Sequence, residues 1–196
     1  MSQDNGYEIS SLNPGWIKKE IPKEFIDEDF LSLIVFYVIN TPCISLSSSG
    51  ISLSSYGWDK DIWKKSDLKA CLFEIASLER NKTFSVAKKT SEMKEACKKV
   101  QLLKGLQKNR DVERIAFYKC QQNEFLSILY HIRNAFAHGR FSLYLTTKQE
   151  VVFVLEDGVK KNGEFQVRSR MVLKKSTLLK WMEILQSGKL PEIHDK

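Results

Sequence analysis

Residues 111–139 read DVERIAFYKCQQNEFLSILYHIRNAFAHG and carry apolar side chains at helical spacing. One apolar stripe would contain Tyr118, Phe125, Leu129, Ile132 and Phe136. An apolar stripe at this spacing is typical of a helix that packs one face on a core. Gly139 follows the last apolar residue, at the position where a left-handed residue often ends a helix. We therefore predict one long helix from about Asp111 to Gly139.

Three more helices are predicted before this segment. The first begins after Asp27, a suitable N-cap, and ends before Pro42. Because it is apolar nearly all round, we expect it to lie centrally. The second and third helices are predicted at residues 66–78 and 85–108, where apolar residues again recur at helical spacing. These segments predict an antiparallel four-helix bundle.

The hydrophobic period changes to that of β-strands after residue 140. Three β-branched or aromatic runs follow, FSLYLTT, EVVFVLED and EFQVRSRMVL. The dipeptides Asp157-Gly158 and Asn162-Gly163 are typical of turns. A closing helix is predicted from Ser176 to Gly188. This part of the chain therefore predicts a three-stranded antiparallel β-meander and a helix.

The predicted fold class is mainly α, a four-helix bundle followed by the meander and the closing helix. Residues 1–24 show no strong periodicity and are predicted to form an N-terminal arm. Residues 25–140 would form the bundle, and residues 141–196 would pack on it.

The composition favours a globular protein with acidic partners. The chain has 196 residues, 42% of them hydrophobic, and a formal net charge of +7. Such a charge suits nucleic acid or an anionic membrane surface, and it is also common in proteins whose lysines are merely solvated. The longest apolar run, residues 30–39, is about half the length that spans a bilayer. Because residues 1–5 are polar and acidic, with no signal segment, we expect a cytoplasmic protein without a membrane partner.

A column of polar side chains is predicted opposite the apolar stripe of the long helix. At about 100° per residue, His131, Asn134 and His138 fall on one face. Such a face meets either water or another subunit.

This column has groups suited to cleaving RNA through its own 2′-hydroxyl. His138 can donate and accept a proton near neutral pH, and Arg133 offers a planar fork for phosphate oxygens. Asn134 precedes His138 by four residues and can orient the imidazole or reach the phosphate. This chemistry needs neither a metal nor a cofactor, and no carboxylate cluster suggests a metal site. The alternatives are a capping histidine, a structural salt bridge of Arg133 and an asparagine without a chemical role.

The string HIRNAFAHGRF, residues 131–141, resembles the R-x4–6-H motif of the HEPN superfamily. The matching residues are Arg133, Asn134 and His138. The resemblance implies a helical bundle with the motif on a helix at a dimer interface. It also implies a metal-independent endoribonuclease, with a toxin or antiphage role and a cognate antitoxin as further implications. The rival interpretations are a non-catalytic HEPN module that binds RNA, a nucleotide or a protein, and a structural dimerisation domain.

One feature of an ideal helix favours a homodimer. Arg133 lies about 140° around the helix from His138, so the two do not share a face. Two motif helices related by a two-fold axis would build a composite site from both chains.

Further cations are predicted to contact the RNA. Arg140 and His131 lie within the motif, and Arg168 and Arg170 alternate along the last predicted strand. With Lys174-Lys175 the two strand arginines would form a basic ribbon that guides RNA, although a solvated edge explains them equally well.

Overall fold

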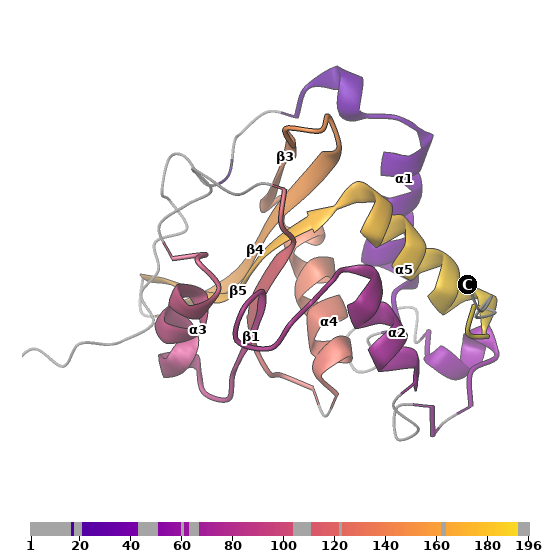
Figure 1. Cartoon of the computed structure of the whole chain (residues 1–196), viewed down its shortest axis with the longest axis horizontal. Coiled ribbons are helices and arrows are strands. Elements are labelled where there is room, and N and C mark those ends of the chain that lie inside the picture. Colours follow the sequence, from indigo (N-terminus) through magenta and orange to yellow (C-terminus); the bar gives the residue numbers. More distant parts are fainter. Residues whose placement is uncertain are drawn as a thin grey trace, which may run out of the picture.

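A five-stranded mixed β-sheet forms the centre of the protein, with helices on both faces (Figure 1). The computed structural model describes residues 17, 21–42, 51–59, 61–62, 67–103, 111–121, 123–161 and 164–191. The strand order is β1-β2-β5-β4-β3, where β1 and β2 are parallel and the other neighbours are antiparallel. The strands are β1 (Phe84–Ala87), β2 (Arg114–Tyr118), β3 (Phe141–Leu145), β4 (Val151–Lys161) and β5 (Glu164–Lys174).

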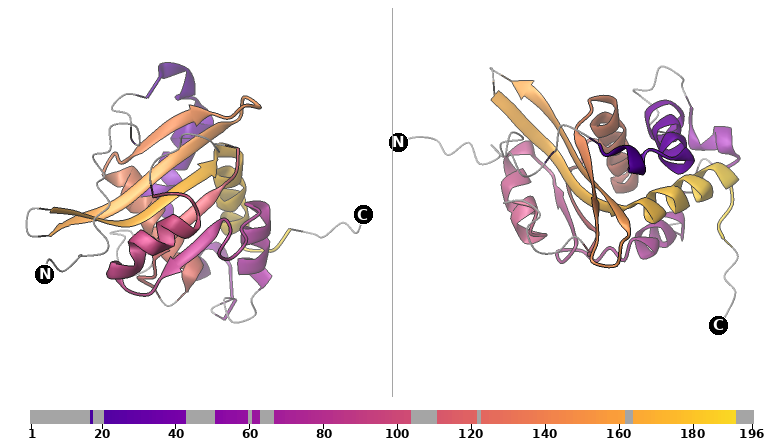
Figure 2. Two further views of the ribbon diagram at one scale, coloured as in Figure 1. Left: turned by 60° about the vertical axis from the view of Figure 1, so that its left-hand side comes forward. Right: turned by 90° about the horizontal axis from the view of Figure 1, so that it is seen from above.

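The helices divide unequally between the two faces of the sheet (Figure 2). The α-helices are α1 (Glu28–Val35), α2 (Asp67–Ile75), α3 (Met93–Lys99), α4 (Glu124–Ala137) and α5 (Lys175–Ser187). A π-helical segment, Phe36–Asn40, continues α1, and short 3-10 helices lie at Lys23–Phe25, Leu53–Tyr56 and Thr90–Glu92. Helix α3 packs on one face, and the other four α-helices share a larger core with the opposite face. We call these the α3 face and the α4 face.

The predicted four-helix bundle is wrong, because the described residues form an α/β fold. Residues within two predicted helices are strands instead, namely FSVA in β1 and RIAFY in β2. In β2, Ile115 and Phe117 enter the core of the α4 face, while Ala116 enters the core of the α3 face. A short apolar run that is buried on both sides has the same pattern in a helix and in a strand. Periodicity therefore could not distinguish them.

For the helix that carries Arg133, Asn134 and His138, the predicted start is wrong and the predicted end is right. Helix α4 begins after Asn123, whose side-chain oxygen accepts hydrogen bonds from the backbone N–H groups of Phe125 and Leu126. This N-cap satisfies donors that a helix start leaves free, so the helix does not extend back to Asp111. The predicted end at Gly139 is confirmed.

The three C-terminal strands and the closing helix are confirmed, but they do not form a separate unit. Strand β5 pairs with β2 through Val172 and Arg114, so one sheet joins both predicted parts of the chain. Gly158 does not lie in a turn, because β4 continues through it with a change of register. The Asn162-Gly163 turn and most of the predicted N-terminal arm lie outside the described residues.

The first helix begins as predicted, since the Asp27 side chain accepts a hydrogen bond from Phe30 N at 2.9 Å. It does not lie centrally. Leu31, Val35 and Ile39 are 55%, 49% and 54% exposed and follow one another at four-residue spacing along one side. In the described part of the chain, no helix combines the length and the apolar character that crossing a bilayer requires.

Candidate functional site

The C-terminal end of α4 presents His138 to solvent. His138 is the C-cap residue, and Gly139 follows in the left-handed conformation with φ +61°. Gly139 N donates to Phe136 O at 3.1 Å, and Arg140 N donates to Ala135 O at 2.8 Å. These two bonds form a Schellman motif, which satisfies terminal carbonyls and turns the chain toward β3.

His131 lies inside the protein as an imidazolium whose two ring nitrogens both form hydrogen bonds. Its Nδ1 lies 2.6 Å from Asp157 Oδ2, and its Nε2 lies 2.7 Å from Tyr118 O. Both oxygens can only accept, so both ring nitrogens donate. Burial alone would lower the pKa of His131, but the hydrogen bonds with Asp157 and Cys120 outweigh it and raise that pKa to about 9.

The predicted contact between His131 and RNA is not supported by this geometry. The side chain is 0% exposed, so it offers no surface to a ligand. The helical pattern predicts that the polar face of α4 meets water or another subunit. In this chain it meets the sheet at His131 and Asn134, because Asp157 provides a buried partner for both.

Asn134 and Arg133 extend the same network toward the surface. Asn134 Nδ2 donates to Asp157 Oδ2 over a long 3.4 Å, and Arg133 Nη1 donates to Asn134 Oδ1 at 3.1 Å. Arg133 is half-buried, and its Nε has no hydrogen-bond partner. No carboxylate of the described residues pairs with Arg133. Arg133 and Asn134, two of the three predicted catalytic residues, therefore contact each other, while His138 lies at the end of the helix.

Arg140 belongs to a second network on the α3 face. Its Nη2 forms an ion pair with Glu156, which is fully buried and also accepts from Arg170 Nε at 2.8 Å. The Arg140 guanidinium lies 3.9 Å from the centroid of the Phe165 ring. Its side chain remains 23% exposed, although its Nε is buried and has no hydrogen-bond partner.

Arg170 is a structural residue in this geometry. It is 1% exposed, and its Nη1 donates to the carbonyl oxygens of Leu102 and Leu103. The prediction that it lines a basic ribbon on the surface is therefore wrong. The two lysines of the predicted ribbon also form ion pairs with acidic side chains: Lys174 pairs with Glu150, and Lys175 pairs with Asp27.

Arg168 is separated from Arg170 by a β-bulge. Asp157 pairs with Ser169 and the next residue, Gly158, pairs with Val167, so Arg168 is the extra residue of β5. The side chain of Arg168 is half-buried, and its Nε has no hydrogen-bond partner.

The acidic partners of these cations were missed in the sequence. Glu156 and Asp157 end the run VVFVLED and are 0% and 3% exposed. Two carboxylates next to a buried apolar strand were the available signal, since buried charges are usually paired. The Asp157-Gly158 dipeptide instead predicts a turn, where acidic residues are common.

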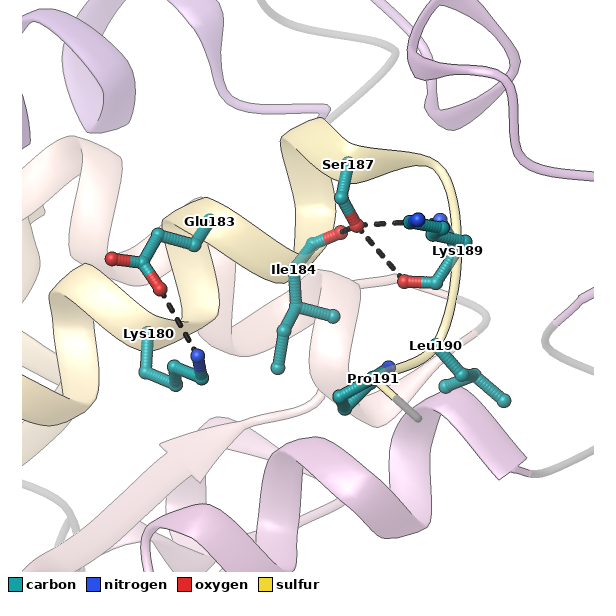
Figure 3. A pocket seen from close by; sticks show the side chains of 7 residues that line it. All are labelled: Lys180, Glu183, Ile184, Ser187, Lys189, Leu190 and Pro191. Carbon is teal, nitrogen blue, oxygen red and sulfur yellow. Dashed lines mark hydrogen bonds and ion pairs between the residues drawn. The ribbon is translucent and has the colours of Figure 1, made fainter. Parts of the chain in front are cut away.

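Two hollows lie away from these networks, beside the C-terminal end of α5. Figure 3 shows the larger hollow, of about 500 Å³, where Lys180 pairs with Glu183 and Ser187 Oγ bonds to Ile184 O and to Lys189. The smaller one, of about 390 Å³, lies between Leu190-Pro191 and α2. Neither contains a predicted site residue. Within the described ranges, no group of three or more His, Cys, Asp or Glu side chains is placed to hold a metal ion.

Comparisons of the chain with protein-family models, with curated proteins and with solved structures found no match.

Proposed function

We propose that the protein is a metal-independent endoribonuclease with His138 as a proton-transfer residue. The observation that carries the proposal is the exposure of His138 at the end of α4. The other described histidine, His131, is held as a buried imidazolium and cannot reach a substrate. Arg133 precedes His138 on the helix and Arg140 follows it, so guanidinium groups flank the imidazole along the chain. Both can bind phosphate oxygens.

The reaction proposed is an internal transesterification of RNA. A base removes the proton of a 2′-hydroxyl, and the oxygen attacks the adjacent phosphorus. The bond from phosphorus to the 5′-oxygen breaks, and an acid protonates this leaving oxygen. The products are a 2′,3′-cyclic phosphate and a 5′-hydroxyl. DNA would not react because it lacks the nucleophile.

A second copy of the chain belongs to the proposal. The reaction needs a base and an acid at the same time, and each chain presents one described histidine to solvent. Two copies of His138 in a two-fold dimer could divide the two tasks.

The proposal rests on side chains and not on the fold, since the described residues do not form the bundle typical of HEPN proteins. A cellular RNA substrate would place the activity in the cytoplasm. Because such an activity is harmful to its host, a cognate antitoxin is part of the same proposal.

A non-catalytic RNA-binding module is the second candidate. It is favoured by the hydrogen bonds that hold Arg133 to Asn134 and Asn134 to Asp157. These bonds hold the Arg133 guanidinium in place for binding, and they give Asn134 a structural role that needs no catalysis.

The test is cleavage of labelled RNA in the presence of EDTA. We expect the wild-type protein to cut RNA, to leave cyclic phosphate ends and to spare DNA of the same sequence. His138→Ala should cut at least about 100-fold more slowly, the usual contribution of a general acid or base. The exposed imidazole contributes little packing, so this variant should fold normally. Lys180→Ala, an exposed change on α5, is the control and should cut like the wild type.

Equal cleavage by wild type and His138→Ala would contradict the proposal. If no RNA is cut but RNA is bound, the second candidate is correct.

A further inference from the structure

Cys120 lies in the short connection between β2 and α4, where its side chain meets the ring of His131. The Cys120 Sγ is 3.7 Å from His131 Nε2, a distance at which sulfur can share a hydrogen bond. The closer acceptor of the same ring N–H is Tyr118 O, at 2.7 Å. The other ring nitrogen, Nδ1, contacts Asp157 Oδ2 at 2.6 Å. The imidazole therefore lies between a thiol and a carboxylate.

This imidazole carries a positive charge at neutral pH. Burial lowers the pKa of His131, but its hydrogen bonds and charge interactions with Asp157 and Cys120 outweigh burial and raise that pKa to about 9. A cation beside a cysteine favours the thiolate over the thiol, and the thiolate is the nucleophilic form. The Asp157 carboxylate opposes this effect more weakly, because it contacts the ring nitrogen that is remote from the sulfur.

The other two cysteines of the described residues are held as thiols. Cys97 is fully buried, and burial raises its pKa to about 12. Cys71 on α2 is half-buried like Cys120, and burial together with the charge of Glu74 raises its pKa. Thiols of this kind are poor nucleophiles at neutral pH. Since Cys71 and Cys120 are both half-buried, the contact with the imidazolium is what distinguishes Cys120.

The surroundings of Cys120 do not cancel the charge of the imidazolium. Glu124, the nearest acidic residue along the chain, forms ion pairs with Lys69 and Arg80. Lys119, which precedes Cys120, is exposed and adds a second positive charge nearby. Cys120 thus combines partial exposure with a neighbouring cation, the setting in which reactive cysteines are usually found.

We propose that Cys120 is a site of thiol–disulfide exchange with low-molecular-weight disulfides, activated by the contact of its sulfur with the His131 imidazolium. The Cys120 thiolate attacks one sulfur of the disulfide, so that a new S–S bond forms while the old one breaks. The released thiolate takes up a proton, equal to the one that the Cys120 thiol gave up. One disulfide is consumed and one mixed disulfide is formed, so no further oxidant is needed.

His131 is a positioning residue in this proposal. It is 0% exposed, keeps its proton throughout and acts on the sulfur of Cys120 without touching the disulfide. Cys120 would react in this way whether or not the protein cuts RNA, so the site goes beyond the proposed function.

The test measures how fast individual cysteines of the full chain react with oxidised glutathione at pH 7. Samples are quenched with acid, and peptide mass spectrometry gives the rates of Cys71 and Cys120 separately. The same rates are measured for the chain unfolded in urea. Partial burial by itself slows a thiol, so a faster reaction in the folded chain reports activation. Cys71 is the matched control, because it is half-buried without a contact to an imidazolium.

Cys120 should react at least about threefold faster in the folded chain than in the unfolded chain. Only a few per cent of an ordinary cysteine is thiolate at pH 7, so the gain in thiolate exceeds the accompanying loss of nucleophilicity. Cys71 should react more slowly in the folded chain. His131→Gln removes the charge but keeps a hydrogen-bond donor, and it should slow Cys120 about tenfold. The rate at Cys71 reports whether this variant is folded, because unfolding would raise it.

Two results would overturn the proposal. The first is a rate at Cys120 that is equal or lower in the folded wild type than in the unfolded chain. The second is an unchanged rate at Cys120 in a folded His131→Gln, because the activation would then not come from the imidazolium. If His131→Gln does not fold, the comparison of the folded with the unfolded wild type decides alone.

Discussion

His131 and Asp157 form a buried ion pair that joins the middle of α4 to the part of β4 that lies opposite the bulge in β5. The distance from Nδ1 to Oδ2 is 2.6 Å, and the two side chains are 0% and 4% exposed. A buried ion pair is tolerated only when its remaining donors and acceptors are also satisfied. Tyr118 O accepts from the second ring nitrogen, and Asn134 donates to the carboxylate. The pair therefore holds the motif helix, and with it Arg133 and Asn134, at a defined position on the sheet.

Removing one member of this pair should destabilise the protein strongly. Asp157→Ala leaves a buried imidazolium without its counter-ion, and we expect the free energy of unfolding to fall by about 3–5 kcal/mol. Urea denaturation measures the change. The double variant His131→Leu/Asp157→Ala is the control, because it leaves no unpaired charge and should cost less than the two single changes together. Simple additivity would contradict the ion pair.

The same pair predicts a loss of stability in mild alkali. The folded pKa of His131 is about 9, whereas an unfolded histidine titrates near 6.5. The folded state therefore holds the proton more tightly. Its contribution is complete below about pH 6.5 and is lost as the pH rises through 9, at up to about 1.4 kcal/mol per pH unit. Urea denaturation between pH 6 and pH 10 tests this, and His131→Gln should lack the same component.

Glu113 predicts a second pH effect at the start of α5. Its carboxylate accepts from Lys174 N at 2.8 Å and from Thr177 Oγ1 at 2.9 Å, so it caps a helix that lacks an N-cap side chain of its own. Burial raises the pKa of Glu113 to about 7, against the opposing effect of these hydrogen bonds. Because the folded state favours the protonated acid, this group makes the protein less stable as the pH rises from about 4.5 to 7.

Glu113→Gln should remove that pH effect. It keeps an acceptor for Lys174 N and avoids a buried negative charge, so at pH 8 we expect a gain of about 1–3 kcal/mol in unfolding free energy. Glu113→Ala, which removes the cap, should instead lose about 1 kcal/mol at pH 5. Lower stability of Glu113→Gln at pH 8 would show that the charged carboxylate stabilises the fold.

Two glycines should respond to alanine for different reasons. A Cβ at Gly158 would lie 2.4 Å from Gln166 O and 2.4 Å from the Phe165 ring. We expect Gly158→Ala to cost about 1–3 kcal/mol and to displace Phe165 from Arg140. At Gly139 a Cβ meets nothing within 4 Å, but φ is +61°, so Gly139→Ala should cost only about 1 kcal/mol. Thermal unfolding compares them, and a smaller loss at Gly158 would contradict the close approach.

Several elements could be predicted because their signals are local. Asp27 and Gly139 act within one turn of the helix ends that they define. The strands β3, β4 and β5 follow from alternation and β-branched composition, and the closing helix ends at Gly188 in the left-handed conformation. The residues of the candidate site, Arg133, Asn134 and His138, could also be named from the sequence.

The remaining features depended on contacts between distant segments. RIAFY became a strand because β5 pairs with it on one side and β1 on the other, and no local signal records those partners. His131 was predicted to contact RNA but is a buried ion, because Asp157, 26 residues later in the sequence, forms an ion pair with it in the core. Arg168 and Arg170 were separated by a bulge that alternation alone cannot reveal.

The sequence by itself therefore determined where helices end, which C-terminal segments are strands and which reactive side chains the motif contains. Caps, turns and hydrophobic period are set by interactions over a few residues. Only the tertiary structure decided the fold class and the accessible members of the motif. Burial and charge pairing depend on which faces meet, and the free energy of a charged side chain differs greatly between water and a packed interior.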